Sequence, residues 1–168
     1  MDQVKEMLFQ NMNGRRFAEI SRQSGSGFAR DDVGRTLIGG DIDNDGDIDL
    51  VVTNNGGAVE VLRNTGGNAR NSIEIRVVGT RSNRDGLGTR LTVTAGGRTQ
   101  VREIKSGSSY LGQNDLRAHV GLGEAARVDR IDVRWPAGQT ESIRDVAANQ
   151  IVTVTEGKGQ TSQSPFAR

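Results

Sequence analysis

The chain has 168 residues, which is enough for one large domain or two small ones with a hydrophobic core. Only 33% of the residues are hydrophobic and 4% are aromatic, whereas glycine occurs 23 times, so the composition favours short strands and many turns over a helical bundle. The formal net charge is +1, and cysteine is absent, which excludes disulfides, thiol catalysis and thiolate metal sites.

The first predicted element is a β-hairpin in the segment "MLFQNMNGRRFAEIS". Phe9 precedes the tight-turn dipeptide Asn13-Gly14, and Phe17 follows it on the returning strand. The N-terminal residues lack the apolar stretch of a signal peptide, and no later segment is long and apolar enough to cross a bilayer. We therefore expect no membrane span.

The next predicted elements form an antiparallel meander of three strands. The strands are "TLIGG", "DLVVT" and "AVEVLRN", and they are separated first by an acidic loop and then by an Asn-Asn-Gly-Gly turn. Val51 and Val52 are adjacent, so we expect the middle strand to be covered on both of its faces.

The acidic loop lies in the segment "GDIDNDGDIDLVV". Its five aspartates are Asp41, Asp43, Asp45, Asp47 and Asp49. Carboxylates this close repel one another, so the loop is either fully solvated or holds a cation. The spacing D-x-D-x-D-G-x-x-D can direct oxygens to one centre, and Ca²⁺ takes about six to eight oxygen ligands. The sequence therefore predicts a Ca²⁺ site, with Gly46 permitting the sharp reversal of the chain.

Alternating apolar residues mark the rest of the chain as a set of short strands. The clearest runs are Ile73, Ile75 and Val77; Leu91, Val93 and Ala95; Ile131, Val133 and Trp135; and Val152 and Val154. About six such strands with glycine-rich turns between them predict an antiparallel β-sandwich or barrel.

A change of composition at "TGGNARN" divides the chain. We predict a blade-like module at residues 1–65, a linker at 66–71, a β domain at 72–157 and a flexible polar tail at 158–168.

The acidic loop and the strands around it resemble the FG-GAP (VCBS-type) repeat of integrin-like β-propellers. In that family the loop lies between the first two strands of a propeller blade and holds Ca²⁺. The resemblance implies that the ligands here are the side chains of Asp41, Asp43, Asp45 and Asp49 and the main chain of Asp47. An EF-hand begins in the same way, but Val52 stands where its closing glutamate would be.

The segments "SNRDGLG", "GLG" and "WPAG" resemble the ASPIC/UnbV domain, over roughly residues 72–157. That module follows FG-GAP repeats in secreted bacterial proteins and in cartilage acidic protein. The resemblance implies an extracellular, β-rich, calcium-binding protein, although the ASPIC/UnbV module has no established biochemical activity.

A single blade at residues 1–65 would leave apolar strands without a cover. FG-GAP propellers close a ring of several blades. The blade strands look too apolar to face water on both sides. We expect a protein partner, identical subunits or further blades to cover residues 1–65, and identical subunits would form rings or open filaments. The alternative is that the second half folds back over the blade and seals it within one chain.

Other residues give little sign of catalysis or of nucleic-acid binding. His119 is the only histidine and lies between apolar residues, and no nucleophile motif surrounds Ser109. Asn83 and Asp85 would form a second polar site or, as we favour, a turn with Asx hydrogen bonds. No basic run is interleaved with aromatic residues, so we expect no nucleic-acid partner.

These observations predict a calcium-binding, non-enzymatic β module for adhesion or self-assembly outside the cell. The first alternative is a carbohydrate-recognition domain, which would expose Trp135 or Tyr110 beside the calcium, although the alternation around Trp135 favours a core position. The second alternative is an accessory domain of an enzyme.

Overall fold

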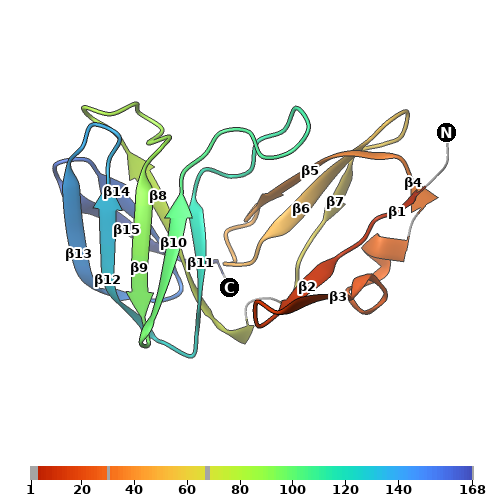
Figure 1. Ribbon diagram of the computed structural model, residues 1–168, viewed down its shortest axis with the longest axis horizontal. Coiled ribbons are helices and arrows are strands. Elements are labelled where there is room, and N and C mark those ends of the chain that lie inside the picture. Colours follow the sequence, from red (N-terminus) through yellow and green to blue (C-terminus); the bar gives the residue numbers. More distant parts are fainter. Residues whose placement is uncertain (1–3, 30, 67–68, 168) are drawn as a thin grey trace.

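The computed structural model describes residues 4–29, 31–66 and 69–167. These form a front half, residues 4–66, and a back half, residues 69–167, that lie side by side (Figure 1). The regular structure is all strands apart from two short 3₁₀ turns, η1 (Ser21–Gln23) and η2 (Ser26–Ala29). The predicted all-β class is therefore confirmed, and none of the described sheets closes into a barrel or a propeller.

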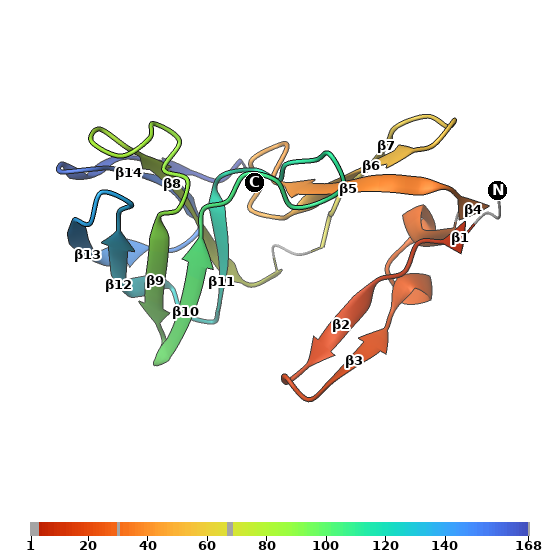
Figure 2. The same ribbon diagram turned by 45° about the horizontal axis from the view of Figure 1, so that its top comes forward.

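The front half begins with two short pairs of strands. β1 (Val4–Lys5) pairs with β4 (Asp31–Asp32), and β2 (Phe9–Met12) pairs with β3 (Arg16–Glu19). At the tip of the second pair Asn13 and Gly14 have φ angles of 57° and 72°, so the hairpin predicted from this dipeptide is confirmed. In Figure 2 the hairpin β2–β3 diverges from the rest of the front half.

The rest of the front half is a three-stranded sheet. β5 (Gly34–Gly40), β6 (Asp49–Asn54) and β7 (Glu60–Leu62) pair antiparallel in that order, which confirms the predicted meander. Val52 is buried, whereas its neighbour Val51, on the other face, is only half-buried. The expectation that both faces of the middle strand are covered therefore holds for one face.

The back half is a sandwich of two four-stranded sheets. Its strands are β8 (Asn71–Val78), β9 (Arg90–Ala95), β10 (Arg98–Glu103), β11 (Ala118–Gly123), β12 (Arg127–Arg134), β13 (Thr140–Ala147), β14 (Gln150–Thr155) and β15 (Gly159–Pro165). One sheet has the order β10-β9-β12-β13 and the other the order β11-β8-β14-β15. Inward side chains of both sheets form one hydrophobic core, because successive residues of a strand point to opposite faces.

One strand pair departs from the antiparallel arrangement that the sequence predicts. β14 runs parallel to β8, with Val152 opposite Ile75 and Val154 opposite Val77. The alternation of apolar residues specifies which face of a strand is buried, but it carries no information on the direction of the neighbouring strand.

The predicted flexible tail at 158–168 is wrong for the residues that the structure describes. β15 pairs antiparallel with β14 at the edge of its sheet, and Phe166 beyond it is buried. The strand escaped prediction because most of its side chains are polar and exposed, so it has no apolar alternation. Residue 168 lies outside the described residues.

The predicted linker at 66–71 overlaps the start of the back half. β8 begins at Asn71, so only the residues before it can be a connection. Residues 67 and 68 of this segment lie outside the described residues.

Candidate metal centre

The aspartate loop, residues 41–49, joins β5 to β6 at the end of the front sheet nearest the back half (Figure 1). Asn44 and Gly46 reverse the chain there with φ angles of 59° and 94°. A glycine adopts such an angle without the strain that a side chain causes. The reversal predicted at Gly46 is therefore confirmed.

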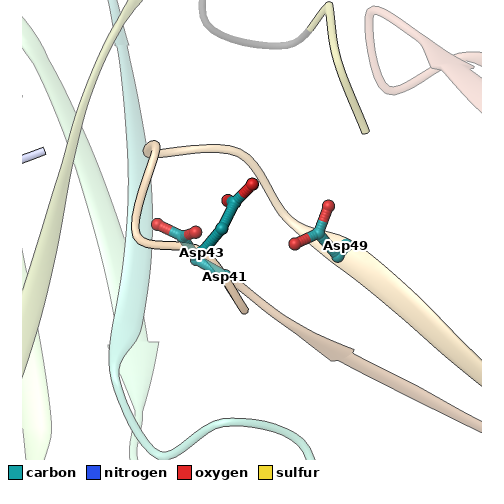
Figure 3. A group of neighbouring side chains, drawn as sticks. All are labelled: Asp41, Asp43 and Asp49. Carbon is teal, nitrogen blue, oxygen red and sulfur yellow. The ribbon is translucent and has the colours of Figure 1, made fainter. Parts of the chain in front are cut away.

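Three of the five aspartates bring their carboxylates together. Asp41, Asp43 and Asp49 each offer one oxygen, and these three oxygens lie within 4.8 Å of one another. Figure 3 shows the three side chains, of which the last, Asp49, is also the first residue of β6. Asp41 and Asp49 are buried and Asp43 is half-buried. This group is the candidate metal centre.

Main-chain N–H groups orient two of these carboxylates. The oxygens of Asp41 accept hydrogen bonds from two N–H groups farther along the loop, at 2.8 and 3.1 Å. The oxygens of Asp49 accept hydrogen bonds from the N–H groups of Ile42 and Asn64, at 3.1 and 2.8 Å. Burial raises the pKa of Asp41, although these N–H bonds and the nearby Arg117 oppose that rise.

The third carboxylate is held differently. Oδ2 of Asp43 forms an ion pair with the guanidinium of Arg63, whose side chain is 63% exposed. Oδ1 of Asp43 is closed to solvent and accepts no hydrogen bond. A buried carboxylate oxygen without a donor is costly, so this atom is suited to a cation ligand.

The other two aspartates of the loop lie outside the group of three. Asp45 and Asp47 are both buried, and Oδ1 of Asp45 accepts a hydrogen bond from the N–H of Asp47 at 2.9 Å. The side chain of Asp45 thus supports the turn of the loop. The regular spacing in the sequence gave no way to separate these supporting residues from the three that converge.

The second predicted polar site, at Asn83 and Asp85, is built as a turn. The side-chain oxygen of Asn83 accepts a hydrogen bond from the N–H of Leu87 at 2.8 Å. Its side-chain nitrogen donates one to the carbonyl of Leu87 at 2.9 Å. Both polar atoms of the Asn83 amide are therefore engaged within the turn, and Asp85 is exposed. This arrangement favours the Asx-turn alternative.

Trp135, Tyr110 and His119 lie in three different environments. Trp135 is 1% exposed and its indole N–H donates to Glu141, so it belongs to the core and cannot be a sugar platform. Tyr110 is exposed, and the guanidinium of Arg35 lies 3.9 Å from the centre of its ring. His119 is half-buried on β11, with Nε2 3.0 Å from the carbonyl oxygen of Gly46.

A partly buried ion-pair cluster beside the loop is not apparent from the sequence pattern. Arg117 forms ion pairs with Glu74, at 2.8 Å, and with Asp115. Burial raises the pKa of Glu74 to about 7, and the positive charge of Arg117 opposes that rise. Glu74 alternates with buried isoleucines on β8, so its position in the sequence is typical of a solvent-facing residue.

The sequence pattern around Glu156 likewise gives no sign of its role. It is 1% exposed, and its Oε2 accepts hydrogen bonds from the N–H groups of Thr80, Arg81 and Ser82, at 2.9, 2.8 and 2.7 Å. Burial alone would raise the pKa of Glu156, but these bonds outweigh it and lower the pKa to about 2. Three successive N–H groups around one carboxylate form an anion nest, which here fastens the end of β14 to the turn after β8.

Comparison with protein families gives a match of residues 79–161 to the family described as ASPIC and UnbV. The match lies in the back half and covers slightly less than half of the chain. It confirms the ASPIC/UnbV resemblance there, whereas the FG-GAP resemblance of the front half stays a prediction. A search of curated proteins gives no match. In the part of the chain that the structure describes, no helical segment has the length and hydropathy that a membrane span requires.

Proposed function

We propose that the front half binds one Ca²⁺ in the aspartate loop, and that the chain is a non-enzymatic, extracellular β module for adhesion or assembly. The observation that carries the calcium site is the convergence of Asp41, Asp43 and Asp49 within 4.8 Å. Ca²⁺ binds oxygens at about 2.3–2.6 Å, so two ligands on opposite sides of one ion are about 5 Å apart. The spacing of the three oxygens therefore fits a shared calcium ion.

The chemistry of the group favours Ca²⁺ over softer metals. Its donors are all carboxylate oxygens, which suit hard cations, whereas zinc sites in proteins generally use histidine or cysteine. Four of the five aspartates in the loop are buried, which a solvated acidic turn does not require. The exposed side chain of Arg63 can move into solvent when a cation neutralises Asp43.

The test of the calcium site is a titration of the purified chain by calorimetry, together with melting curves in Ca²⁺ and in chelator. Saturating Ca²⁺ at roughly a hundredfold excess over Kd adds about 2.7 kcal/mol to the free energy of unfolding. Asp43→Asn is the most informative variant, because this carboxylate accepts no main-chain hydrogen bond from the described residues of the loop. We expect it to lose most of the calcium-dependent increment, while the exposed-turn control Asp85→Asn retains it.

Equal melting temperatures of the native chain in Ca²⁺ and in chelator, with no heat of binding, would contradict the calcium site. Loss of calcium binding in Asp85→Asn would indicate that calcium binds outside the aspartate loop.

The assembly role is supported by exposed apolar side chains of the front half. These are Met7, Phe9, Phe17, Leu37, Ile42, Val59 and Val61, each about half exposed or more. Such a concentration usually marks an interface, so we propose a protein partner or identical subunits as its cover. Light scattering at micromolar concentration, with and without Ca²⁺, tests self-assembly, and a clean monomer of 18.0 kDa in both conditions would contradict it.

Carbohydrate recognition is a second candidate, favoured by the exposed ring of Tyr110. Arg35 stacks on one face of the ring, and Tyr110 is still 54% exposed, which leaves surface for a sugar. A glycan array with the native chain and Tyr110→Ala tests it, and binding that persists in the variant would contradict a role for this ring.

A further inference from the structure

The outer side of the aspartate loop is the surface on which the two halves meet. The carbonyl oxygen of Asp41 accepts a hydrogen bond from Arg117 at 2.6 Å, and that of Asn44 accepts one from the N–H of Ala167 at 2.7 Å. The carbonyl oxygen of Gly46 lies 3.0 Å from Nε2 of His119. Carboxylates of the loop thus converge on the candidate metal centre, while its main-chain carbonyls are bound by the back half.

Arg117 is the central residue of this contact. Its guanidinium donates to the side chain of Asn44 and to the carbonyl of Asp41, at 2.6 Å each, and also pairs with Glu74 and Asp115. The side chain of Arg117 is only 18% exposed. Glu74 and Asp115 hold the planar guanidinium in one position. Its hydrogen bonds to Asn44 and to the carbonyl of Asp41 therefore form in one conformation of the loop.

An apolar contact fixes the loop at its glycine. A side-chain carbon added to Gly46 would lie 2.5 Å from Cδ2 of Phe166. The ring therefore lies directly against the backbone of the loop, and Ser72 of β8 donates to the carbonyl of the same glycine at 3.3 Å. Both β8 and the residue after β15 hold this position.

A second contact between the halves follows the open edge of β5. The bridging loop, residues 104–117, connects β10 to β11 and runs beside β5 (Figure 1). The N–H groups of Leu37 and Gly39 donate to the side chains of Ser109, at 3.2 Å, and Asn114, at 2.9 Å. The back half therefore caps this edge of the blade within one chain, which is part of the sealing that the sequence left open as an alternative.

We propose that the aspartate loop is a cation-dependent latch between the two halves of the chain. A cation on its inner side and the back half on its outer side fix the same backbone, so each strengthens the binding of the other. Such coupling is reciprocal, and typical coupling energies change an affinity by about 5- to 150-fold. The cation dependence rests on the calcium site proposed above.

The first test is calcium affinity in variants that leave every proposed ligand intact. We expect Arg117→Ala to weaken calcium binding by about tenfold, within the usual range of coupling, because the loss of the contact outweighs the removal of a positive charge that acts on Asp41. His119→Phe keeps an aromatic ring of similar size but loses the contact to Gly46, and we expect a smaller loss in the same direction. Arg130→Ala is the control, because Arg130 is exposed and pairs with Asp132 on the back half.

Trp135 fluorescence reports whether the core of each variant is folded, because this residue is buried in the back half. Folded Arg117→Ala and His119→Phe with native calcium affinity would overturn the latch. Should Arg117→Ala fail to fold, His119→Phe decides the question alone.

The second test measures the docking of the halves and does not depend on calcium affinity. The native chain has no cysteine, so spin labels can be placed at Val59→Cys and Lys158→Cys, one exposed position in each half. We expect a narrow distance distribution in Ca²⁺ and a broader one in chelator, with Arg117→Ala broader than the native chain in chelator. Distance distributions that change neither on removal of Ca²⁺ nor in Arg117→Ala would overturn the latch.

The two proposals fail differently in these tests. A native chain without measurable calcium binding contradicts the calcium site and the cation dependence together, whatever the distances are. A native chain that binds calcium while Arg117→Ala and His119→Phe bind it equally well contradicts the latch alone.

Discussion

The two halves of the molecule are stabilised in different ways. The back half has a continuous core with residues such as Ile73, Leu91 and Ile131 fully buried. Among the described residues of the front half, Val52 is the one buried hydrophobic residue, and the other buried side chains are polar or acidic. The back half thus gains its stability mainly from apolar burial, whereas the front half buries little apolar surface and is held largely by polar contacts.

The largest expected effect is the cost of a cavity in the back half. Ile131→Ala should lower the free energy of unfolding by about 2–5 kcal/mol, because it leaves a void in a closed core. Val61→Ala, at a side chain that is 62% exposed in the front half, should change it by no more than about 0.5 kcal/mol. Urea unfolding followed by Trp135 fluorescence measures both, and similar effects of the two substitutions would contradict the comparison.

An intermediate effect on stability is expected at Glu156, where the back half is held by a buried carboxylate and not by apolar contact. The pKa of Glu156 is lowered from 4.5 to about 2, so its stabilising contribution is complete above 4.5 and is lost as the pH falls towards 2. Glu156→Gln should lower the melting temperature at neutral pH and flatten its decline across this acidic range. Melting curves between these pH values measure the change.

Glu124→Gln is the matched control for Glu156, because the side chain of Glu124 is exposed and its ion pair with Arg70 is long, at 3.7 Å. A decline in melting temperature with falling pH that is as steep in Glu156→Gln as in the native chain would count against the anion nest.

The smallest effect on stability is expected at the exposed aromatic residues of the front half. Phe17 is 68% exposed on the hairpin β2–β3, so Phe17→Ser should leave the free energy of unfolding nearly unchanged. If identical subunits cover this hairpin, the same substitution should reduce the mass measured by light scattering at micromolar concentration. A large loss of stability without a change in mass would place Phe17 in the fold and not in an interface.

Local features were predictable because neighbouring residues determine them. The Asn13-Gly14 turn needs positive φ angles that these residue types tolerate, and the alternation at Ile73, Ile75 and Val77 follows from the pleat of one strand. The spacing of the aspartates placed oxygens of three of them near one another, because a short loop leaves few other directions. The Trp135 position in the core followed from the same alternation.

Features that depend on distant segments were decided by the tertiary structure. β15 is a strand because β14 offers it an edge, although its own side chains carry no strand pattern. Arg117 and Glu156 are one arginine and one glutamate among many in the sequence, and each acquires its role only where partners from distant segments surround it. Gly46 unites the two cases, since its sequence context required a reversal of the chain, while only the fold placed Phe166 against it.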